Sequence, residues 1–569
     1  MVRPLEETSL YYLQKSVLRV TNETSDKFVP APSRNQILSD LLIGLKRFRN
    51  VVRWKHFFAE KKRKEEELKN SPLSQPAFNN KFSFETEENE NARQTNPEGL
   101  KSGLKPANQT QNAPIGSPKT ESFLKELEET LIKQVMDDTF TKNARDENIR
   151  MVLDDLCQSN EVVVSTDKTN SIKVVKTVKY EKWVNGHLET SAKEINREKI
   201  LQIFELATAK CEDLYDFLDE KEYNFLKSTL KTRNIPTPKL IIKDHKKLNE
   251  EGDFPSRLIV PANNFTSAFP RLGYLGIRRI FDSNKIKYET NTITQASDLK
   301  EELEKLDIKK NKVTIAKLDI VAMYPSIQFK LVRKAIEFFA QDLPEKEKEK
   351  IEKCLEMISF GMSNTIVNFK DKFFEYDGDV DGKERGLTIG GYESAWLADL
   401  VAVFILEKNK KQFENTIYHG IYRDDGFTIF KGVLSASDIK TWLSNFQKEV
   451  DNLAESNCLQ FTLEVWGKDE NESFKDNNMI TMINEKYFPY LDMEMSWNKS
   501  NELIFRVHLK PNQKLKYLNS DSTHLSSTFK AIPQGVLARL GKLTSKCKKL
   551  RNTTINKIYP LHAEALRVT

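Results

Sequence analysis

The stretch VTIAKLDIVAMYPSI, residues 313–327, decides the fold, because it contains an apolar strand that ends at Asp319 and is followed by Tyr324 and Pro325. A lone Asp after a strand is usually a turn former. Here the strand is nearly all apolar, so the Asp319 carboxylate is expected at the edge of a buried sheet. A charge is costly there unless a cation or a donor neutralises it. The segment therefore predicts an acid with a chemical role, beside the simpler interpretation of a turn.

A second acidic segment is TIYHGIYRDDGFTIF, residues 416–430, in which two short apolar strands flank Arg423, Asp424, Asp425 and Gly426. Asp-Gly between strands is typical of a hairpin. Taken alone, a surface hairpin with two acids in its turn explains the pattern equally well. If its strands pair with the one that ends at Asp319, the acids form one cluster, and such a cluster needs a divalent metal.

The predicted cluster suits Mg²⁺, which is usually held by few carboxylates together with substrate phosphates. Two such ions promote in-line displacement at phosphorus, as in polymerases. We therefore expect two Mg²⁺ ions as cofactors, for which Mn²⁺ can substitute, with Asp319, Asp424 and Asp425 as both metal ligands and catalytic residues.

A glycine-rich segment, GLTIGGYESAWLADLVAVFILE, covers residues 386–407. Gly390 and Gly391 give a backbone that another chain can approach closely. The helix predicted after them is apolar on nearly all sides and so is expected to be buried. By itself, an ordinary glycine turn before a core helix is the better interpretation.

A basic hairpin is predicted within residues 238–262, where Lys243, Lys246 and Arg257 lie between short apolar runs. Cations near a carboxylate–metal site would hold a nucleoside triphosphate, and Arg can do so in a bidentate way. For any one of these residues alone, a charged exposed hairpin is the better interpretation.

Composition bounds the remaining possibilities. The chain has 569 residues, a net charge of +6, 38% hydrophobic and 30% charged residues, which excludes a collagen-like, mucin-like or wholly disordered protein. The five cysteines are scattered without a CxxC pair and are expected to be reduced thiols rather than a disulfide framework or zinc site. No apolar run approaches the roughly 20 residues of a membrane helix, and the N-terminus lacks a signal-peptide core. The sequence therefore predicts an intracellular protein with no membrane partner.

The four segments, in this order, resemble the reverse transcriptase family. Asp319 with Tyr324 resembles motif A, which consists of a metal-binding Asp and an aromatic residue that acts as a sugar gate. Residues 387–395 resemble the LPQGxxxSP motif B, and residues 422–425 resemble the YxDD box. Residues 461–496 are similar to the segments after that box, including a motif E hairpin. The resemblance covers about residues 140–540 and implies template-directed DNA synthesis.

A narrower resemblance is to Penelope-like retroelement reverse transcriptases. Residues 143–168, which end in Asp-Lys, are similar to a segment ahead of their fingers, and residues 508–540 resemble their thumb-side region. The chain departs from the common pattern at two places. The segment LTIGG lacks the Pro and Gln of motif B. Arg423 adds a cation beside the acids, and its partner could be a phosphate or only the neighbouring acids. The only Gly-Ile-Tyr belongs to the acidic hairpin, so the chain resembles a type without the GIY-YIG endonuclease, or it is truncated before one.

The resemblance implies an α+β fold, a right-hand polymerase with fingers, palm and thumb, an antiparallel palm sheet and a helical N-terminal extension. The expected segments are a basic and aromatic N-terminal segment over 1–70, a flexible linker over 71–120, a mostly helical extension over 121–235, fingers over 236–310, a palm with motifs A, B, C and E over 311–500, and a basic thumb over 501–569.

The expected function is an RNA-directed DNA polymerase of a retroelement, with an RNA template, a DNA primer and dNTPs as partners and a nuclear or nucleocytoplasmic location. Tyr324, Gly390, Lys243, Lys246 and Arg257 are expected to bind the nucleotide. Six thumb cations are expected to bind nucleic acid with salt-sensitive affinity: Arg539, Lys542, Lys546, Lys548, Lys549 and Arg551.

Three alternatives remain open. A family B-like DNA polymerase shares a DxxSLYPSI box, but its helix motif and Tyr-x-Asp-Thr-Asp box are missing here. A viral RNA-dependent RNA polymerase would carry Gly-Asp-Asp in the hairpin. A catalytically silent, reverse-transcriptase-derived RNA-binding protein is disfavoured, because a binding module has no need for three crowded acids.

Overall fold

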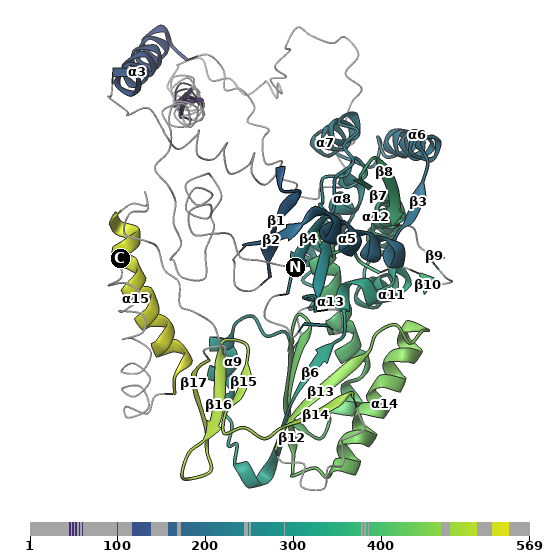
Figure 1. The fold of residues 1–569 in the computed structure, drawn as a ribbon, viewed down its shortest axis with the longest axis vertical. Helices are drawn as coiled ribbons and strands as arrows, with labels where there is room; N and C mark the ends of the chain where they lie inside the picture. Colours follow the sequence, from purple (N-terminus) through teal and green to yellow (C-terminus); the bar gives the residue numbers. More distant parts are fainter. Residues whose placement is uncertain are drawn as a thin grey trace, which may run out of the picture.

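The computed structural model describes residues 116–137, 158–243, 248–467, 478–508 and 526–545, with short gaps inside these ranges, together with Leu100 and nine positions between 42 and 60. These residues form a mixed α+β fold (Figure 1). In the part of the chain so described, no helix combines the length and apolar composition that a membrane crossing requires.

The central sheet has five strands in the order β11-β12-β6-β13-β14. All neighbours are antiparallel except β13 and β14, which are parallel. The two acidic segments therefore pair, which was the condition for a single acidic cluster, since β6 carries the first and β11–β12 the second. The strands are β6 (Val313–Ile320), β11 (Thr416–Tyr422), β12 (Asp425–Lys431), β13 (Phe461–Trp466) and β14 (Ile480–Ile483).

Alternate residues of β6 enter different cores, as the two-residue period of a strand requires. Ala316, Leu318 and Ile320 join the core that also holds residues of the helices, whereas Val313 and Ile315 join a core shared with a second sheet. Burial on both sides explains why β6 is nearly all apolar until Asp319. The helices of the first core include α11 (Phe329–Ala340), α12 (Glu345–Ser363), α13 (Ser394–Lys408) and α14 (Ala436–Ala454).

The predicted buried helix is α13. Ten of its residues are buried, because its sequence is apolar around the whole circumference. It packs against α11 and the short α10 (Met323–Ser326), so it reaches the segment that follows Asp319.

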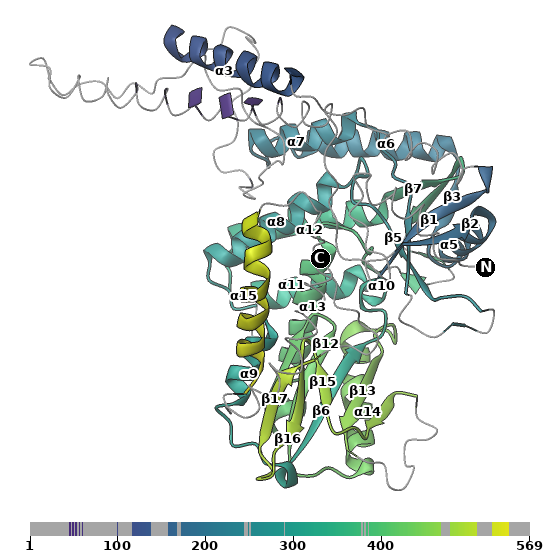
Figure 2. The ribbon, with the colours of Figure 1, turned by 60° about the vertical axis from the view of Figure 1, so that its left-hand side comes forward.

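The second sheet has the order β15-β16-β17 and is antiparallel: β15 (Phe488–Tyr490), β16 (Met493–Trp497) and β17 (Leu503–Val507). It corresponds to the hairpin predicted after the YxDD-like box. The helices α9 (Ala296–Leu303) and α15 (Ser526–Leu543) lie beside this sheet (Figure 2), and α15 contacts β17 and α9.

The basic hairpin predicted in residues 238–262 is confirmed as β4 (Lys239–Ile242) and β5 (Ser256–Ile259). Two further strands, β1 (Glu161–Thr166) and β2 (Ile172–Lys176), extend it into one sheet of order β2-β1-β4-β5. The segment expected to be a separate, mostly helical extension therefore shares a sheet with the expected fingers. Its helices are α5 (Thr177–Ser191), α6 (Arg197–Asp213) and α7 (Glu220–Lys231).

The helix α8 (Ala268–Ser283) packs tightly on α12. A Cβ on Gly273 would lie 2.6 Å from the Cys354 carbonyl oxygen, so only glycine permits this approach. Leu100 also enters this core: it is 3% exposed and donates its N–H to the Phe217 carbonyl at 2.5 Å. One residue of the range expected as a flexible linker is thus fixed in the core.

A further sheet, β3-β8-β7, joins β3 (Lys193–Ile195) to a hairpin between the expected motifs A and B. The hairpin strands are β7 (Thr365–Phe369) and β8 (Lys372–Tyr376), and the short pair β9 (Asp379–Val380) and β10 (Lys383–Glu384) follows. The sequence did not predict this contact between segments about 180 residues apart.

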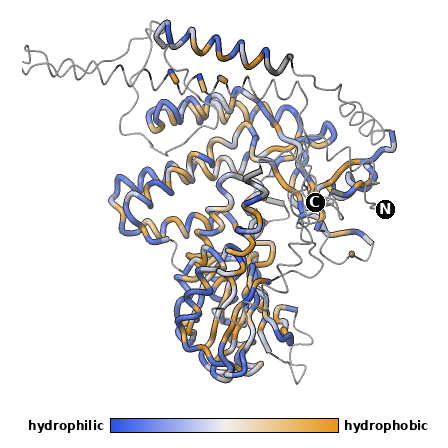
Figure 3. The backbone as a smooth tube through the Cα atoms, turned by 90° about the vertical axis from the view of Figure 1, so that its left-hand side faces the viewer, coloured by the Kyte–Doolittle hydropathy of each residue, from blue (hydrophilic) through white to orange (hydrophobic). Residues whose placement is uncertain are grey.

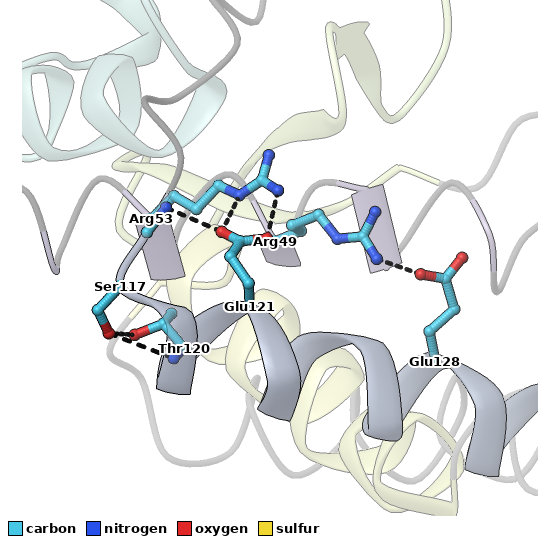
Figure 4. Close-up of polar contacts among 7 residues, drawn as sticks. Arg49, Arg53, Ser117, Thr120, Glu121 and Glu128 are labelled. Carbon is cyan, nitrogen blue, oxygen red and sulfur yellow. Dashed lines mark hydrogen bonds and ion pairs between the residues drawn. The ribbon is translucent and has the colours of Figure 1, made fainter.

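Two arginines of the basic N-terminal segment contact α3 (Pro118–Asp137), which begins inside the range expected as a linker. Arg53 donates from Nε to Glu121 at 2.7 Å, and Arg49 pairs with Glu128 (Figure 4). The hydrogen bonds from Arg53 lower the pKa of Glu121 to about 2. Along α3, hydrophobic and hydrophilic positions alternate (Figure 3). Because Arg53 and Arg49 are both paired with carboxylates of α3, neither is fully free to bind nucleic acid.

Candidate active site

Three acids meet at one end of the central sheet. Asp319 lies directly opposite Asp425 in the β6–β12 ladder, and the Ile320 N–H donates to the Asp424 carbonyl at 3.3 Å. Directly opposed residues point to the same face of a sheet, so the side chains of Asp319 and Asp425 share a face. All three acids are exposed. The structure thus brings together the three residues that the sequence singled out as ligands.

The acidic hairpin has a two-residue turn, Arg423-Asp424, because Tyr422 pairs with Asp425. Arg423 has φ +57°, a left-handed conformation that usually requires glycine. Ala322, between Asp319 and Tyr324, is also left-handed with φ +47° and ψ +48°. For residues with a Cβ this costs roughly 1–2 kcal/mol each. Strained positions of this kind cluster at functional sites.

The acids fit a metal held jointly by protein and substrate. Within the residues described, no three Asp, Glu, His or Cys side chains are grouped so as to hold a metal ion by themselves. Mg²⁺ does not need such a cage, since it commonly takes one or two carboxylates, waters and substrate phosphates. Asp319 and Asp425, two exposed carboxylates opposite each other at a strand end, provide that kind of donor set.

Tyr324 is half-buried on α10, next to the acids. Its carbonyl accepts a hydrogen bond from the Leu387 N–H at 2.8 Å, which fixes the start of the glycine-rich loop against it. Its hydroxyl is hydrogen-bonded by Arg423. Burial raises the pKa of Tyr324, and the positive charge of Arg423 opposes that rise.

Arg423, whose partner the sequence left open, faces Tyr324 and Asp399 of α13. Both groups act to raise the pKa of its guanidinium, against the effect of burial. Asp399 is a residue that sequence reasoning missed, because a single acid in an apolar helix gives no signal until the hairpin is placed beside it.

The close approach predicted at Gly390 is confirmed, and the approaching chain is the end of β5. A Cβ on Gly390 would lie 2.1 Å from the Val260 carbonyl oxygen, and its φ is +122°. The Val260 N–H donates to the Ile389 carbonyl at 2.9 Å. Gly390 therefore joins the glycine-rich loop to the β4–β5 hairpin, and its contact with nucleotide stays a prediction.

The predicted triphosphate-binding cations lie on the β4–β5 hairpin where the structure describes them. The Lys243 N–H donates to the Pro255 carbonyl at 2.8 Å, and Arg257 on β5 pairs with Asp167 at 4.0 Å. Lys246 lies outside the described residues. Asp167 follows β1, so the strand pair added to this sheet supplies an acid to Arg257.

Of the predicted thumb cations, Arg539 and Lys542 lie on α15. Arg539 forms an ion pair with Asp492, in the β15–β16 turn, at 2.9 Å, whereas Lys542 is exposed. One predicted nucleic-acid contact is therefore also a link between α15 and the second sheet. The remaining four cations lie outside the described residues: Lys546, Lys548, Lys549 and Arg551.

The second sheet is tied to the acids by Tyr490, another residue that sequence reasoning did not single out. Its hydroxyl donates to the Asp425 carbonyl at 2.8 Å. Burial and the neighbouring Asp425 and Asp424 raise the pKa of Tyr490, so the hydroxyl keeps the proton that it donates. This bond holds the acidic hairpin against β15.

Glu393, at the N-terminus of α13, gives a pH prediction. It is 5% exposed, accepts a hydrogen bond from Ser394 Oγ at 3.4 Å, and burial raises its pKa above 4.5. The neutral form is favoured in the folded state, so this contribution to stability is present below about pH 4.5 and is lost as pH rises through the folded pKa. We expect Glu393→Gln to match or exceed the parent in Tm at pH 7 and to remove this pH dependence.

Thermal unfolding between pH 4 and 8 tests this expectation, with Glu449→Gln on the exposed side of α14 as the control that should not change Tm. A Glu393→Gln variant that is clearly less stable than the parent at pH 7 would mean that Glu393 is ionised and paired.

No protein-family model and no curated protein matches the chain. Among solved structures it is similar to telomerase from Candida albicans in complex with a fragment of telomeric RNA, at 10% identity over 80% of this chain and 69% of that one, TM-score 0.45. It is also similar to apo telomerase from Candida tropicalis truncated from its C-terminal domain, at 10% identity over 68% and 71%, TM-score 0.40. A third is the BmCPV RNA-dependent RNA polymerase at elongation state, at 12% identity over 64% and 30%, TM-score 0.33. With TM-scores below 0.5, these likenesses do not assign the chain to a family.

Proposed function

We propose that this protein is an RNA-directed DNA polymerase of a retroelement, which adds dNTPs to a primer 3′-hydroxyl. The observation that carries the proposal is the register of the central sheet: Asp319 directly opposite Asp425, with Asp424 in the adjoining turn. Metal-assisted chemistry at phosphorus uses carboxylates grouped in this way, whereas a binding module would gain nothing from three crowded charges.

In this proposal Asp319 and Asp424 would hold two Mg²⁺ ions, and Asp425 would assist. When bound, the metals lower the pKa of the attacking hydroxyl and stabilise the leaving pyrophosphate. The Arg257 and Lys243 side chains, with Lys246, neutralise the triphosphate from the β4–β5 hairpin. The hydrogen bond from Tyr490 keeps the acidic hairpin in place while substrate binds.

Tyr324 sets sugar selection in this proposal. Its ring lies under the incoming sugar, where a 2′-hydroxyl would clash with it, so deoxynucleotides are preferred. Its neighbours support a fixed position: Arg423 bonds its hydroxyl, and Leu387 bonds its carbonyl.

The narrower proposal, a Penelope-like element, is supported by sequence resemblance in residues 143–168 and 508–540. An RNA template, a DNA primer and a nuclear location follow from that resemblance. The basic C-terminal region, including the exposed Lys542, would grip a phosphate backbone with salt-sensitive affinity.

Primer extension by the full chain tests the proposed function. With dNTPs and Mg²⁺ on matched RNA and DNA templates, we expect extension on RNA, and chelation of the metal should abolish it, because carboxylates repel phosphates unless a cation lies between them. No extension on the RNA template, with the chain folded by circular dichroism, would overturn the proposal. Extension on DNA alone would favour a DNA-templated polymerase.

A further inference from the structure

Tyr392 is an exposed aromatic at the end of the glycine-rich loop. The residue is 46% exposed, which for a single surface aromatic is ordinary. What distinguishes it is its neighbour: the guanidinium carbon of Arg271 on α8 lies 4.4 Å from the centre of the Tyr392 ring.

Arg271 lies near a second ring as well, since its guanidinium carbon is 5.3 Å from the centre of the Phe225 ring on α7. Among the residues that the structure describes, no acid forms an ion pair with Arg271. Its charge is therefore stabilised by aromatic faces, and within the described part of the chain its side-chain N–H donors are available to a bound group.

Both residues come from elements that packing holds in place. Gly390 fixes the loop against Val260, as described above. The helix that carries Arg271 packs on α12 through Gly273, where any side chain would collide with the Cys354 carbonyl. A ligand that binds here meets a preformed surface, so binding costs little conformational entropy of the protein.

The loop also connects this surface to the acids. It begins at Leu387, bonded to the Tyr324 carbonyl, and Tyr392 is five residues further on. Five residues span at most roughly 18 Å, so Tyr392 lies within a few nucleotides of the proposed site of addition.

We infer that Tyr392 and Arg271 form a binding site for an unpaired nucleotide of a single-stranded template, with the base stacked on the Tyr392 ring and Arg271 donating to a phosphate. Bases within a duplex are already stacked on each other, whereas an exposed ring takes an unstacked base regardless of sequence. Arg is suited to phosphate by its planar donor fork. The inference deepens the proposed polymerase function and rests on it for the identity of the strand.

The test is binding of the full chain, without dNTPs, to a DNA primer on an RNA template with a five-uridine 5′ overhang, compared with the same duplex made blunt. We expect Tyr392→Leu to weaken binding to the overhang substrate at least about fivefold, the lower end of what one lost base stack costs, and to leave the blunt duplex unchanged. Tyr392→Phe keeps the ring and should bind as the parent does. Arg271→Gln should weaken overhang binding and lower the salt dependence by about one phosphate contact.

Phe123→Leu removes an exposed ring on α3 and serves as the matched control, with no expected change. Equal losses on both substrates, or no loss for Tyr392→Leu, would overturn the inference. The Tm of Arg271→Gln shows whether a loss of binding comes from a loss of stability. The Tyr392 variants test the same site without a change in α8. Because binding needs no catalysis, a chain that discriminates overhang from blunt duplex but fails to extend primers would contradict only the polymerase function.

Discussion

Asp424→Asn is expected to reduce primer extension by about 10³-fold or more while the protein stays folded. Asn has nearly the same shape as Asp, and Asp424 is exposed in a two-residue turn, so the fold loses little. The proposed metal loses a charged ligand. Metal stabilisation of a transition state is worth several kcal/mol, and each 1.36 kcal/mol corresponds to a factor of about ten in rate.

The matched control is Asp371→Asn, in the turn between β7 and β8. Asp371 is likewise exposed in a hairpin turn, with φ +61°, a conformation that Asn adopts readily. Its variant should extend primers at the parent rate. Single-turnover rates and far-UV circular dichroism of both variants check the prediction. Extension by Asp424→Asn at the parent rate would remove Asp424 from the catalytic site.

Tyr324→Ala is expected to lower discrimination against ribonucleotides by about 100-fold, because a pocket wall typically resolves one added hydroxyl by about that factor. Removal of the ring would open space beside the proposed position of the sugar and would release Arg423 from its hydrogen bond. The measurement is the ratio of kcat/KM for a dNTP to that for the matching ribonucleotide.

Tyr324→Phe separates the ring from the hydroxyl. It keeps the steric wall and loses only the bond to Arg423, so we expect discrimination close to that of the parent. If the Phe variant loses discrimination as the Ala variant does, the hydroxyl and Arg423 set selection instead of the ring. If Tyr324→Ala discriminates between dNTPs and ribonucleotides as the parent does, the Tyr324 ring is not the sugar gate.

The sequence by itself determined the local features of the site. An apolar strand that ends at Asp319, and Asp-Gly between two short strands, predict a strand and a hairpin because side-chain alternation and turn chemistry act over a few residues. The all-round apolar pattern of residues 394–408 likewise predicts the buried α13. The resemblance to reverse transcriptases added the expected roles of these residues.

Only the tertiary structure decided which distant segments meet. β1 joins β4 across more than 70 residues, and β3 joins β8 across about 180, while the local sequence of each strand is compatible with several partners. The ion pair Arg257–Asp167 depends on the pairing of β1 with β4, and the ion pair Arg539–Asp492 depends on the packing of α15 beside the second sheet. The stacking of Arg271 on Tyr392 depends on helix packing through Gly273. Charged and aromatic surface residues carry no periodic signal of their partners, because their contacts follow from how the buried faces pack.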